Sequence, residues 1–446
     1  MGISSFYGLQ TSLRGLQAQQ RSIDVTGHNI ANASTKGYSR QEATLAASAG
    51  LQVPAGSVQT GAGAHLGSGV DVQSYRRVRD TFLDLQYRAQ ATSLGEHQTT
   101  TQTLDRAELA LAEPSDNGLN TQLSRFWNAW SDVANGPESP ASRQALISQA
   151  GSLATSFAAV DSQLATVGAQ ADQEYADLTG PGGEVAAIAR ELAGLNDTIG
   201  RFVTEGDSPN DLMDQRDLLL DRLSELGQVS VSQGAQAGSV VVRFGDAADP
   251  LVEDTTVTWP QTLTTPGGRL GALKALGGAT GQISAYRSTL NSLAAGLADA
   301  VNAIHNTGNG GAAPNFFSYT AGSAASSLAV AVTTTQVATT AGTATGANDV
   351  ARAIAALRGG TTDSTYRAFV ARVGTDVRES TRLEANAETL AQSVDDRRQS
   401  TSGVAMDEEM SNLVRFQRAY QASARAMSTM DEMLDVLINR TGRVGL

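Results

Sequence analysis

The residues best suited to catalysis or metal binding are few in this chain, and their spacing suits neither. The absence of cysteine excludes thiolate metal ligands, cysteine nucleophiles and disulfides. No His-Glu-x-x-His motif, the signature of one class of zinc protease, is present. None of the histidines has metal-ligand spacing to another; they are His28, His65, His97 and His305. The sequence therefore predicts no metal site.

Acidic side chains and glycine clusters also lack the arrangement that enzymes use. Asp395-Asp396 and Glu408-Glu409 fall in expected helices, where successive carboxylates point apart. Gly61-Ala62-Gly63 lacks the third glycine of a dinucleotide-binding loop, and no P-loop lysine follows any glycine cluster. We interpret one further charged group as i,i+3 pairs on a helix surface; it comprises Asp211, Asp214, Arg216 and Asp217. We expect neither an enzyme nor a cofactor, although a cleft holding a carboxylate of raised pKa would favour an enzyme.

Length and composition indicate a globular chain of several domains that binds neither nucleic acid nor membranes. The 446 residues exceed what one core usually covers, so about two or three domains are expected. The formal net charge of −13 opposes a nucleic-acid surface or a polybasic membrane patch. No run of about 18 apolar residues occurs, and Met1–Leu13 lacks the basic and apolar regions of a secretory signal.

Both ends of the chain carry apolar residues at alternating spacings of three and four, which is typical of a coiled-coil seam. The N-terminal seam is Phe6, Leu9, Leu13, Leu16, Gln20, Ile23, Gly27 and Ile30. The C-terminal seam is Leu413, Phe416, Tyr420, Ser423, Met427, Met430, Leu434 and Leu437. One such stripe alone is better explained by a core helix of a globular domain. Two matching seams at opposite termini predict that the ends pack on each other or on neighbouring subunits, and their small, neutral flanks favour a multi-helix assembly.

Between the seams the pattern predicts a mainly α protein with a small β-containing insertion. Helices are expected over 5–33, 80–111, 119–134, 141–178, 184–204, 209–226, 282–305, 351–357 and 366–398, with Ser139-Pro140 opening the fourth and Asp207 or Ser208 capping the sixth. Apolar alternation in 228–263 predicts a small antiparallel β unit, and 35–78 and 306–346 read as extended or loop segments with short strands. We therefore expect three domains, namely 1–45 with 400–446 (coiled-coil-like), 46–227 with 270–399 (an elongated helical rod), and 228–269 (β-rich).

Three terminal motifs resemble the bacterial flagellar axial family of rod, hook and hook-associated proteins. The first is the segment from His28 through Asn29, Ile30, Asn32 and Gly37 to Tyr38 and Arg40, where turn formers should end the helix near Ala33. The others are Leu66–Val72 followed by Arg79–Leu83, and Ser402–Ala422. Ala405 departs from the polar helix cap common in the family, although Asp407, Glu408 and Glu409 still suit the first turn.

Within that family, the middle of the chain is similar to the first of the proteins at the hook–filament junction. The similar segments are Phe126–Trp130, Ala134–Pro137, Arg143–Leu146, Asn210–Asp217, Leu293–His305, Pro314–Ser318 and Ala324–Val330. The region that often holds a large outer domain is short here, which predicts a compact knob.

The resemblance implies a structural protein of the flagellum that joins hook to filament and forms a platform for the second junction protein and the filament. Implied partners are the hook protein, the second junction protein, copies of the chain in an axial ring and a flagellar export chaperone. Implied localisation is extracellular, after type III export without a cleaved signal. The residues expected to act are the seam positions and the Asn29–Tyr38 turn, in subunit packing.

Two other readings remain open at this point. A hook or distal-rod protein would have a β-dominated middle in place of long helices. A cytosolic coiled-coil scaffold would have termini that are folded in the monomer, and would stay in the cell.

Overall fold

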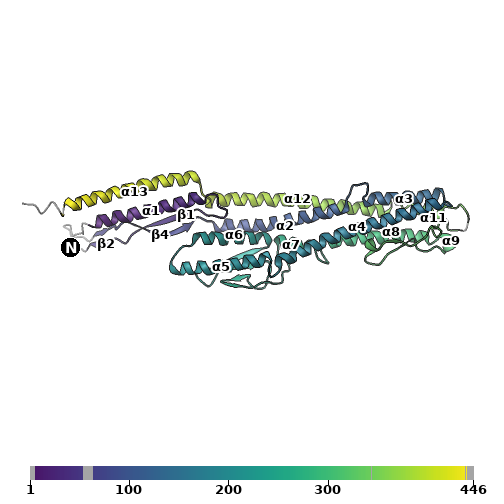
Figure 1. The fold of residues 1–446 in the computed structure, drawn as a ribbon, viewed down its shortest axis with the longest axis horizontal. Helices are drawn as coiled ribbons and strands as arrows, with labels where there is room; N and C mark the ends of the chain where they lie inside the picture. Colours follow the sequence, from purple (N-terminus) through teal and green to yellow (C-terminus); the bar gives the residue numbers. More distant parts are fainter. Residues whose placement is uncertain (1–5, 54–63, 343, 437, 439–446) are drawn as a thin grey trace, which may run out of the picture.

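A computed structural model describes residues 6–53, 64–342, 344–436 and 438. The molecule is elongated, with its first and last helices at the same end of its long axis (Figure 1). There α1 (Tyr7–Asn32) lies beside α13 (Met406–Asp435). A Cβ added to Gly8 would lie 2.8 Å from the side chain of Met430, and Asn29 bonds to Glu409. The start of α1 therefore faces the end of α13, so the two helices are antiparallel.

A strand hairpin and its extension connect this pair to the remainder of the chain. Strand β1 (Gln41–Ala47) pairs antiparallel with β4 (Val70–Arg77), and β2 (Leu51–Val53) pairs with β3 (Ala64–Leu66). The hairpin packs against α1. At its base, the backbone N–H of Val78 donates to Arg40 and that of Arg40 donates to Ser402, the last residue of α12. The hairpin thus joins the terminal helices to the rod.

The rod is a bundle whose longest helices run along the molecule. Helix α2 (Thr81–Leu111) lies beside α12 (Thr361–Ser402), and the Tyr366 hydroxyl bonds to Glu113 while Arg398 stacks on Tyr87, so these two are also antiparallel. Helices α4 (Pro140–Thr179), α8 (Gln282–His305), α3 (Leu119–Asn135) and α11 (Asp349–Ala355) complete the bundle. Ser139 accepts from the Ser142 N–H, which confirms the predicted start of α4.

The far end of the rod holds the largest aromatic cluster. Phe126, Trp127 and Trp130 on α3 are fully buried against Phe316 and Phe317, with ring centroids of neighbouring pairs 4.9–6.5 Å apart. Short elements cover this cluster: α9 (Gly308–Gly311), β9 (Phe317–Ser318), α10 (Ala324–Ser327) and β10 (Ala329–Val330). The similar Phe126–Trp130 segment therefore marks the core of the rod tip.

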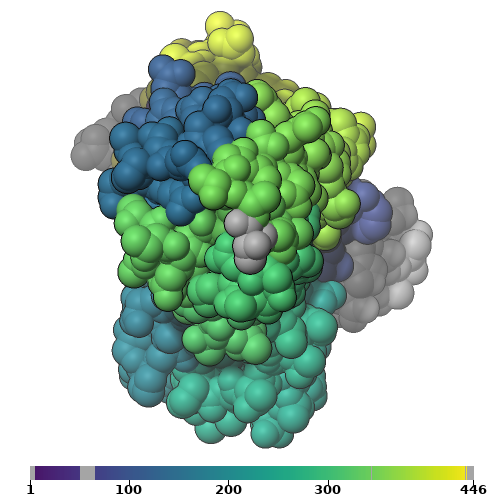
Figure 2. All heavy atoms as spheres, turned by 90° about the vertical axis from the view of Figure 1, so that its right-hand side faces the viewer, coloured from purple at the N-terminus to yellow at the C-terminus, as the bar shows by residue number. Residues whose placement is uncertain are grey.

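A side lobe projects from the rod, as the end-on view also shows in teal (Figure 2). It contains α5 (Glu184–Glu205), α6 (Asn210–Leu226) and an antiparallel sheet in the order β5-β6-β7-β8. The strands are β5 (Val229–Gln233), β6 (Val240–Phe244), β7 (Val252–Glu253) and β8 (Thr256–Val257). Helix α7 (Gly268–Leu276) returns the chain to the rod. The lobe has a hydrophobic core of its own, separate from that of the rod, which includes Leu220, Leu223 and Phe244.

The predicted fold class, mainly helical with a small β-containing insertion, is confirmed. Two local predictions are wrong. Helix α7 begins at Gly268, where we expected no helix before 282, because Pro266-Gly267-Gly268 has the composition of a loop. Neither Asp207 nor Ser208 caps α6, whose N-cap is Pro209 without a side-chain bond. Ala405 is likewise the N-cap of α13 without a side-chain bond, and three acidic residues occupy the first turn as expected.

His305 links the end of α8 to two loops of the rod tip through its two ring nitrogens. It is fully buried; its Nε2 accepts from the Ala338 N–H at 2.9 Å, so Nδ1 carries the proton and donates to Pro314 O at 2.7 Å. Burial lowers the pKa of His305, and the bond to Pro314 opposes this less strongly. Because the folded pKa lies below the ordinary 6.5, the stabilisation is complete above that pH and is lost as the pH falls through the folded pKa.

We therefore expect urea unfolding of the chain to require less urea as the pH falls from about 7 to about 5. The variant His305→Gln should lose most of this pH dependence. The control variant His97→Gln replaces a half-buried histidine on α2 and should keep it. Equal pH dependence in the wild type and His305→Gln, measured by circular dichroism, would contradict the assignment.

Candidate assembly site where the terminal helices join the rod

Asn29, one of the predicted turn residues, is the centre of a buried hydrogen-bond network at the base of the terminal helices. Its side chain is 1% exposed. The amide oxygen Oδ1 accepts from the Gln41 N–H at 2.9 Å and from the Tyr38 hydroxyl at 2.8 Å. The amide nitrogen Nδ2 donates to Gln41 O at 2.9 Å and to the Glu409 carboxylate at 3.2 Å. One side chain thus connects α1, the following turn, β1 and α13.

The other predicted turn residues give the chain its reversal after α1. The Asn32 amide donates to His28 O, and its oxygen accepts from the Thr35 hydroxyl. Gly37 has φ +84°, and a Cβ there would lie 3.3 Å from Leu218 on α6. Glycine is therefore required at this position both by the backbone conformation and by the close approach to the rod.

The hydroxyl of Tyr38 also lies 3.1 Å from Nδ1 of His28. Burial, and then the charges of Asp211 and Asp214, raise the pKa of Tyr38, so its hydroxyl keeps the proton that it donates to Asn29.

Asp211 and Asp214 of α6, which we interpreted as part of a surface group, instead hold the segment that leads into the hairpin, together with the neighbouring Asn210. The carboxylate of Asp214 accepts from both the backbone N–H and the hydroxyl of Ser39, at 2.9 and 2.8 Å. Asp211 accepts from the Gln41 side chain at 2.7 Å, and the Asn210 amide donates to Gln41. Helix α6 of the side lobe is therefore bonded directly to the segment that follows α1.

Below this contact lies a buried network of ion pairs between β4, α2, α6 and α12. Asp217 is in contact with Arg77 at 2.8 Å, Arg79 at 3.1 Å and Arg88 at 3.2 Å. Arg79 also pairs with Asp84 at 2.7 Å. Two more aspartates continue the network: Asp221 bonds to Arg88 and Arg398, and Asp395 bonds to Arg398. The network crosses the boundary between the hairpin and the rod.

Electrostatics favour the charged states of Asp217 and Arg79 in this network. Burial raises the pKa of Asp217, but the nearby charges of Arg79, Arg77 and Arg88 outweigh it, and the resulting pKa lies below the ordinary value. Burial lowers the pKa of Arg79, whereas its hydrogen bond to Asp84 and the charge of Asp217 raise it to a higher net value. Asp217 and Arg79 therefore stay ionised at neutral pH, and their ion pairs hold the hairpin against the rod.

The prediction that Asp211, Asp214, Arg216 and Asp217 form i,i+3 pairs on a helix surface is wrong. Asp214 and Arg216 are buried, and the partners of Asp214 and Asp217 come from other elements. Arg216 donates to Asn196 and to Gly238 O inside the side lobe. The spacing along α6 gave a plausible local pairing, but the actual partners lie more than a hundred residues away for both aspartates.

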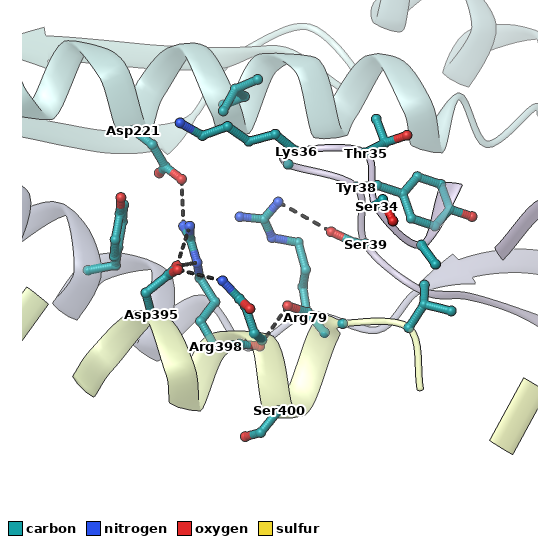
Figure 3. A pocket seen from close by; sticks show the side chains of 18 of the residues that line it. Ser34, Thr35, Lys36, Tyr38, Ser39, Arg79, Asp221, Asp395, Arg398 and Ser400 are labelled. Atoms are coloured by element: carbon teal, nitrogen blue, oxygen red, sulfur yellow. Dashed lines mark hydrogen bonds and ion pairs between the residues drawn. The ribbon is translucent and has the colours of Figure 1, made fainter. Parts of the chain in front are cut away.

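A cavity of about 590 Å³ lies between the turn after α1 and the connector between α12 and α13 (Figure 3). Its lining includes Lys36, Arg79, Asp221, Asp395 and Arg398. Both of its carboxylates bond to Arg398. The two carboxylates that line the cavity are therefore engaged in ion pairs.

The terminal helices meet along a face that differs from the predicted N-terminal seam. The buried residues of α1 are Ala18, Ser22, Thr26 and Asn29, and Gly8 and Gly15 face Met430 and Ser423 of α13. Leu9, Leu16, Ile23 and Ile30 are half-buried beside this face, whereas Phe6 and Leu13 are 53% and 40% exposed. Gly8 and Gly15, which approach α13 closely, thus each lie one position before a predicted seam residue, Leu9 and Leu16.

On α13 the predicted seam lies on the side facing α1. Its described members are all half-buried; they are Leu413, Phe416, Tyr420, Ser423, Met427, Met430 and Leu434. Leu437 lies outside the described residues. The pairing of the two chain ends is thus as expected from the sequence, and only the rotation of α1 differs.

Ser39, Gln41 and the arginines of the ion-pair network were not singled out from the sequence. One of these arginines, Arg79, begins the motif Arg79–Leu83, but the spacing of the arginines along the chain did not indicate which aspartates they pair with. Within the described ranges, no group of histidine and acidic side chains could hold a metal ion. Within the same ranges, no helix is long and apolar enough to cross a membrane.

Comparison with known proteins gives matches along most of the chain. Residues 104–266 match the family model described as the helical domain of flagellar hook-associated protein FlgK. Residues 9–38 match the flagella basal body rod protein model, and residues 397–440 match the C-terminal model of flagellar basal body rod FlgEFG proteins. The two rod-protein matches cover most of the terminal helices, and the first also covers the Asn29–Tyr38 turn.

Individual relatives carry the same description. The chain is 30% identical to flagellar hook-associated protein 1 of Bacillus subtilis, over 98% of this chain and 99% of that protein. It is 31% identical to flagellar hook-associated protein 1 of Salmonella typhimurium, over 69% of this chain and 58% of that protein. The solved structure of the flagellar hook junction protein FlgK from Burkholderia pseudomallei aligns with a TM-score of 0.45 at 22% identity, over 53% of this chain and 47% of that one.

Proposed function

Because the chain belongs to the family of flagellar hook-associated protein 1, we propose that it caps the hook and provides the surface on which the second junction protein and then the filament assemble. Like the family, it is a structural axial protein of the bacterial flagellum at the hook–filament junction. The polar, interlocked base of the terminal helices supports a mechanical role, since it joins the rod to the part of the molecule that packs against its neighbours.

The observation that carries this proposal is the incomplete burial of the terminal helix pair. The buried residues of α1 are small or polar, and Glu409 is the only buried residue within the described part of α13. Each large apolar side chain that is fully buried contributes about 1.5–3 kcal/mol, so this pair gains little from its own contact. Exposed Leu13, Met410 and Val414 present apolar surface to other subunits.

We assign the predicted site residues to two roles on this basis. The half-buried seam residues and the Asn29–Tyr38 turn hold the two terminal helices and the rod in one orientation. The exposed residues Phe6 and Leu13 contact neighbouring copies. The domain division follows the same logic, with 1–45 and 400–446 as the packing domain and 46–227 and 270–399 as the rod domain. Within this division the lobe consists of the 228–269 insertion together with α5 and α6 of the rod domain.

The partners that this role requires are the hook protein, copies of the chain in an axial ring, the second junction protein and a flagellar export chaperone. Extracellular location after type III export follows from the same role. A hook or distal-rod protein would need a β-dominated middle, and the helical rod contradicts that alternative. A cytosolic scaffold would not share the axial family's terminal segments.

Deletion of the gene in a flagellated cell tests the proposal. We expect hooks without filaments on the cell surface and filament protein lost to the medium, both restored by the gene on a plasmid. Electron microscopy of the cells and immunoblots of the medium are the measurements. Normal filaments on the deletion strain would overturn the proposed function.

A further inference from the structure

A groove between α5 and α6 crosses the surface of the side lobe. It encloses about 430 Å³, and its lining includes Gly194, Leu195 and Thr198 of α5 and Leu218 and Leu219 of α6. Glycine is unfavourable inside a helix, yet a Cβ added at Gly194 would meet no atom within 4 Å. Packing within this chain therefore does not require glycine at this position, and the groove leaves room for a partner.

Two large apolar side chains project from the beginning of α2. Phe82 and Leu85 lie one turn apart and are 63% and 54% exposed. Ala89 continues the same face of the helix and is also exposed. Neighbouring apolar side chains that water reaches form a surface that a partner can cover. We call Phe82 and Leu85 the knob.

The knob lies at the same level of the rod as the groove. Two hydrogen bonds fix the register of α2 against α6: Arg88 bonds to Asp221, 133 residues later, and Thr92 bonds to Ser224, 132 residues later. The two helices are therefore parallel. The same offset places Leu85 level with Leu218 in the groove.

The knob and the groove nevertheless open on opposite faces of the molecule. Each contains residues three and six positions before a residue that points to the other helix; these are Leu85 and Phe82 before Arg88, and Leu218 and Gln215 before Asp221. At about 3.6 residues per turn, both sets are rotated by about 60–120° from the line between the helices, in the same sense. Because parallel helices that face each other are related by a half-turn, equal rotations direct the two sets to opposite sides.

Charges at this level are complementary between the two faces. Arg76 precedes the knob and is 71% exposed, with Glu42 at 3.6 Å. Asp211 lies at the hairpin end of α6 and is 58% exposed, with His28 at 3.6 Å and a bond to Gln41. Both lie where the hairpin meets α6, so copies placed side by side at equal height bring the base of one copy towards the acid of the next.

The contact is too small to hold two free copies together. Phe82 and Leu85 offer a few hundred Å² of apolar surface, whereas stable complexes of free proteins bury about 1,200–2,000 Å². The knob and the groove therefore meet only where another contact already holds copies side by side. The proposed packing of the terminal helices, which join the rod at this level, supplies that contact.

We propose that the groove of one copy receives the knob of the next copy in the axial ring. This inference rests on the proposed function, which places copies side by side, and it adds a contact between lobe and rod to that of the terminal helices. Because the knob and the groove open on opposite faces, each copy contacts a different neighbour on each side, and the contact continues around the ring. A two-fold contact between two knobs would instead stop at a dimer.

Cysteine cross-linking in the gene-deletion strain tests the proposal, because the chain has no cysteine of its own. The double variant Leu85→Cys with Gly194→Cys carries one thiol in the knob and one in the groove. Oxidation of isolated flagella with copper phenanthroline should link it into dimers, trimers and longer species on non-reducing gels. Each single variant should stay monomeric, and the two single variants expressed together should stop at dimers. Leu85→Cys with Gly151→Cys, whose second thiol lies at an open position of α4, is the matched control and should form no ladder.

Filling the groove gives a second test that needs no cross-link. Gly194→Gln places a side chain in the groove and favours the helix, so the folded chain should resist urea at least as well as the wild type. We expect cells that express it to export the protein and to lack filaments, because the knob can no longer enter. Gly151→Gln makes the same change at an equally open position of α4 and should keep filaments.

Immunoblots of the medium separate a failure of export from a failure of assembly. Filaments on cells with Gly194→Gln would overturn the inference, as would monomers alone after oxidation of flagella that carry the double variant. Dimers of Leu85→Cys alone would indicate a two-fold contact and overturn it too. If the double variant assembles no flagella, the comparison of Gly194→Gln with Gly151→Gln decides; if Gly194→Gln is retained in the cell, the cross-links decide. If the gene deletion itself leaves filaments, the proposed function fails instead.

Discussion

Replacing Asp217 by Asn is expected to lower the free energy of unfolding by about 3–5 kcal/mol, the usual cost of breaking a buried ion pair on one side. The substitution keeps the shape of the side chain but removes the negative charge that Arg77, Arg79 and Arg88 share within 3.2 Å. The guanidinium groups would then remain buried with fewer counter-charges. Urea unfolding followed by circular dichroism measures the loss.

Asp197→Asn provides the matched control for this prediction. Asp197 also lies on a helix and pairs with an arginine, Arg201, but both side chains are more than half exposed. Its loss should cost no more than about 1 kcal/mol. Similar losses in the two variants would show that the buried network does not clamp the rod to the hairpin.

The pH dependence of Asp217→Asn gives an independent readout. The folded pKa of Asp217 lies below its ordinary value of 3.8, so its charge stabilises the fold above that pH, and the stabilisation is lost as the pH falls through the folded pKa. The difference in stability between the wild type and the variant should therefore shrink as the pH falls below about 4. A constant difference down to that range would contradict the ionised state of the network.

The pairing of the terminal helices could be predicted from the sequence because the spacing of apolar residues along one helix does not depend on the rest of the fold. It did not predict the rotation of α1. The predicted seam includes the large residues Phe6 and Leu13, which are exposed, whereas Gly8 and Gly15 lie against Met430 and Ser423 of α13 and their lack of a side chain lets that helix approach. Spacing defines several stripes on one helix, and the partner helix decides which of them is covered.

The ion-pair network could not be predicted for a related reason. Asp214 and Asp217 have arginine partners on β4 and α2, well over a hundred residues earlier in the chain. The sequence contains many arginines and aspartates, and only the packed arrangement of the hairpin, α2 and α6 selects which of them meet. Asn29 was predicted as a turn residue, but its four partners, including Glu409 at the other end of the chain, also depend on this packing.

Replacing Asn29 is expected to loosen the terminal helices while leaving the rod intact. Asn29→Ala leaves the Gln41 N–H and Gln41 O without their partner, and each unsatisfied buried group costs about 1–3 kcal/mol. Asn29→Asp should be at least as harmful despite its similar shape, because it exchanges the donor Nδ2 for an oxygen beside the Glu409 carboxylate. Hydrogen exchange of backbone amides measures the effect, which should accelerate exchange in α1 and α13 and not in α4 or α8.

Asn32→Ala is the control that separates the loss of the Asn29 bonds from the general effect of removing an amide side chain from the turn. Asn32 is half-exposed and bonds only within the turn and the end of α1, to His28 O and Thr35. It should therefore change exchange only near the end of α1. In the strain without the chromosomal gene, cells that express Asn29→Asp should lack filaments, whereas cells that express Asn32→Ala should keep them. Of these two residues, only Asn29 bonds α1 to α13. If Asn29→Asp leaves the exchange of α13 unchanged, the bond to Glu409 does not hold the helices together, and the orientation of the packing surface must depend on the apolar seam alone.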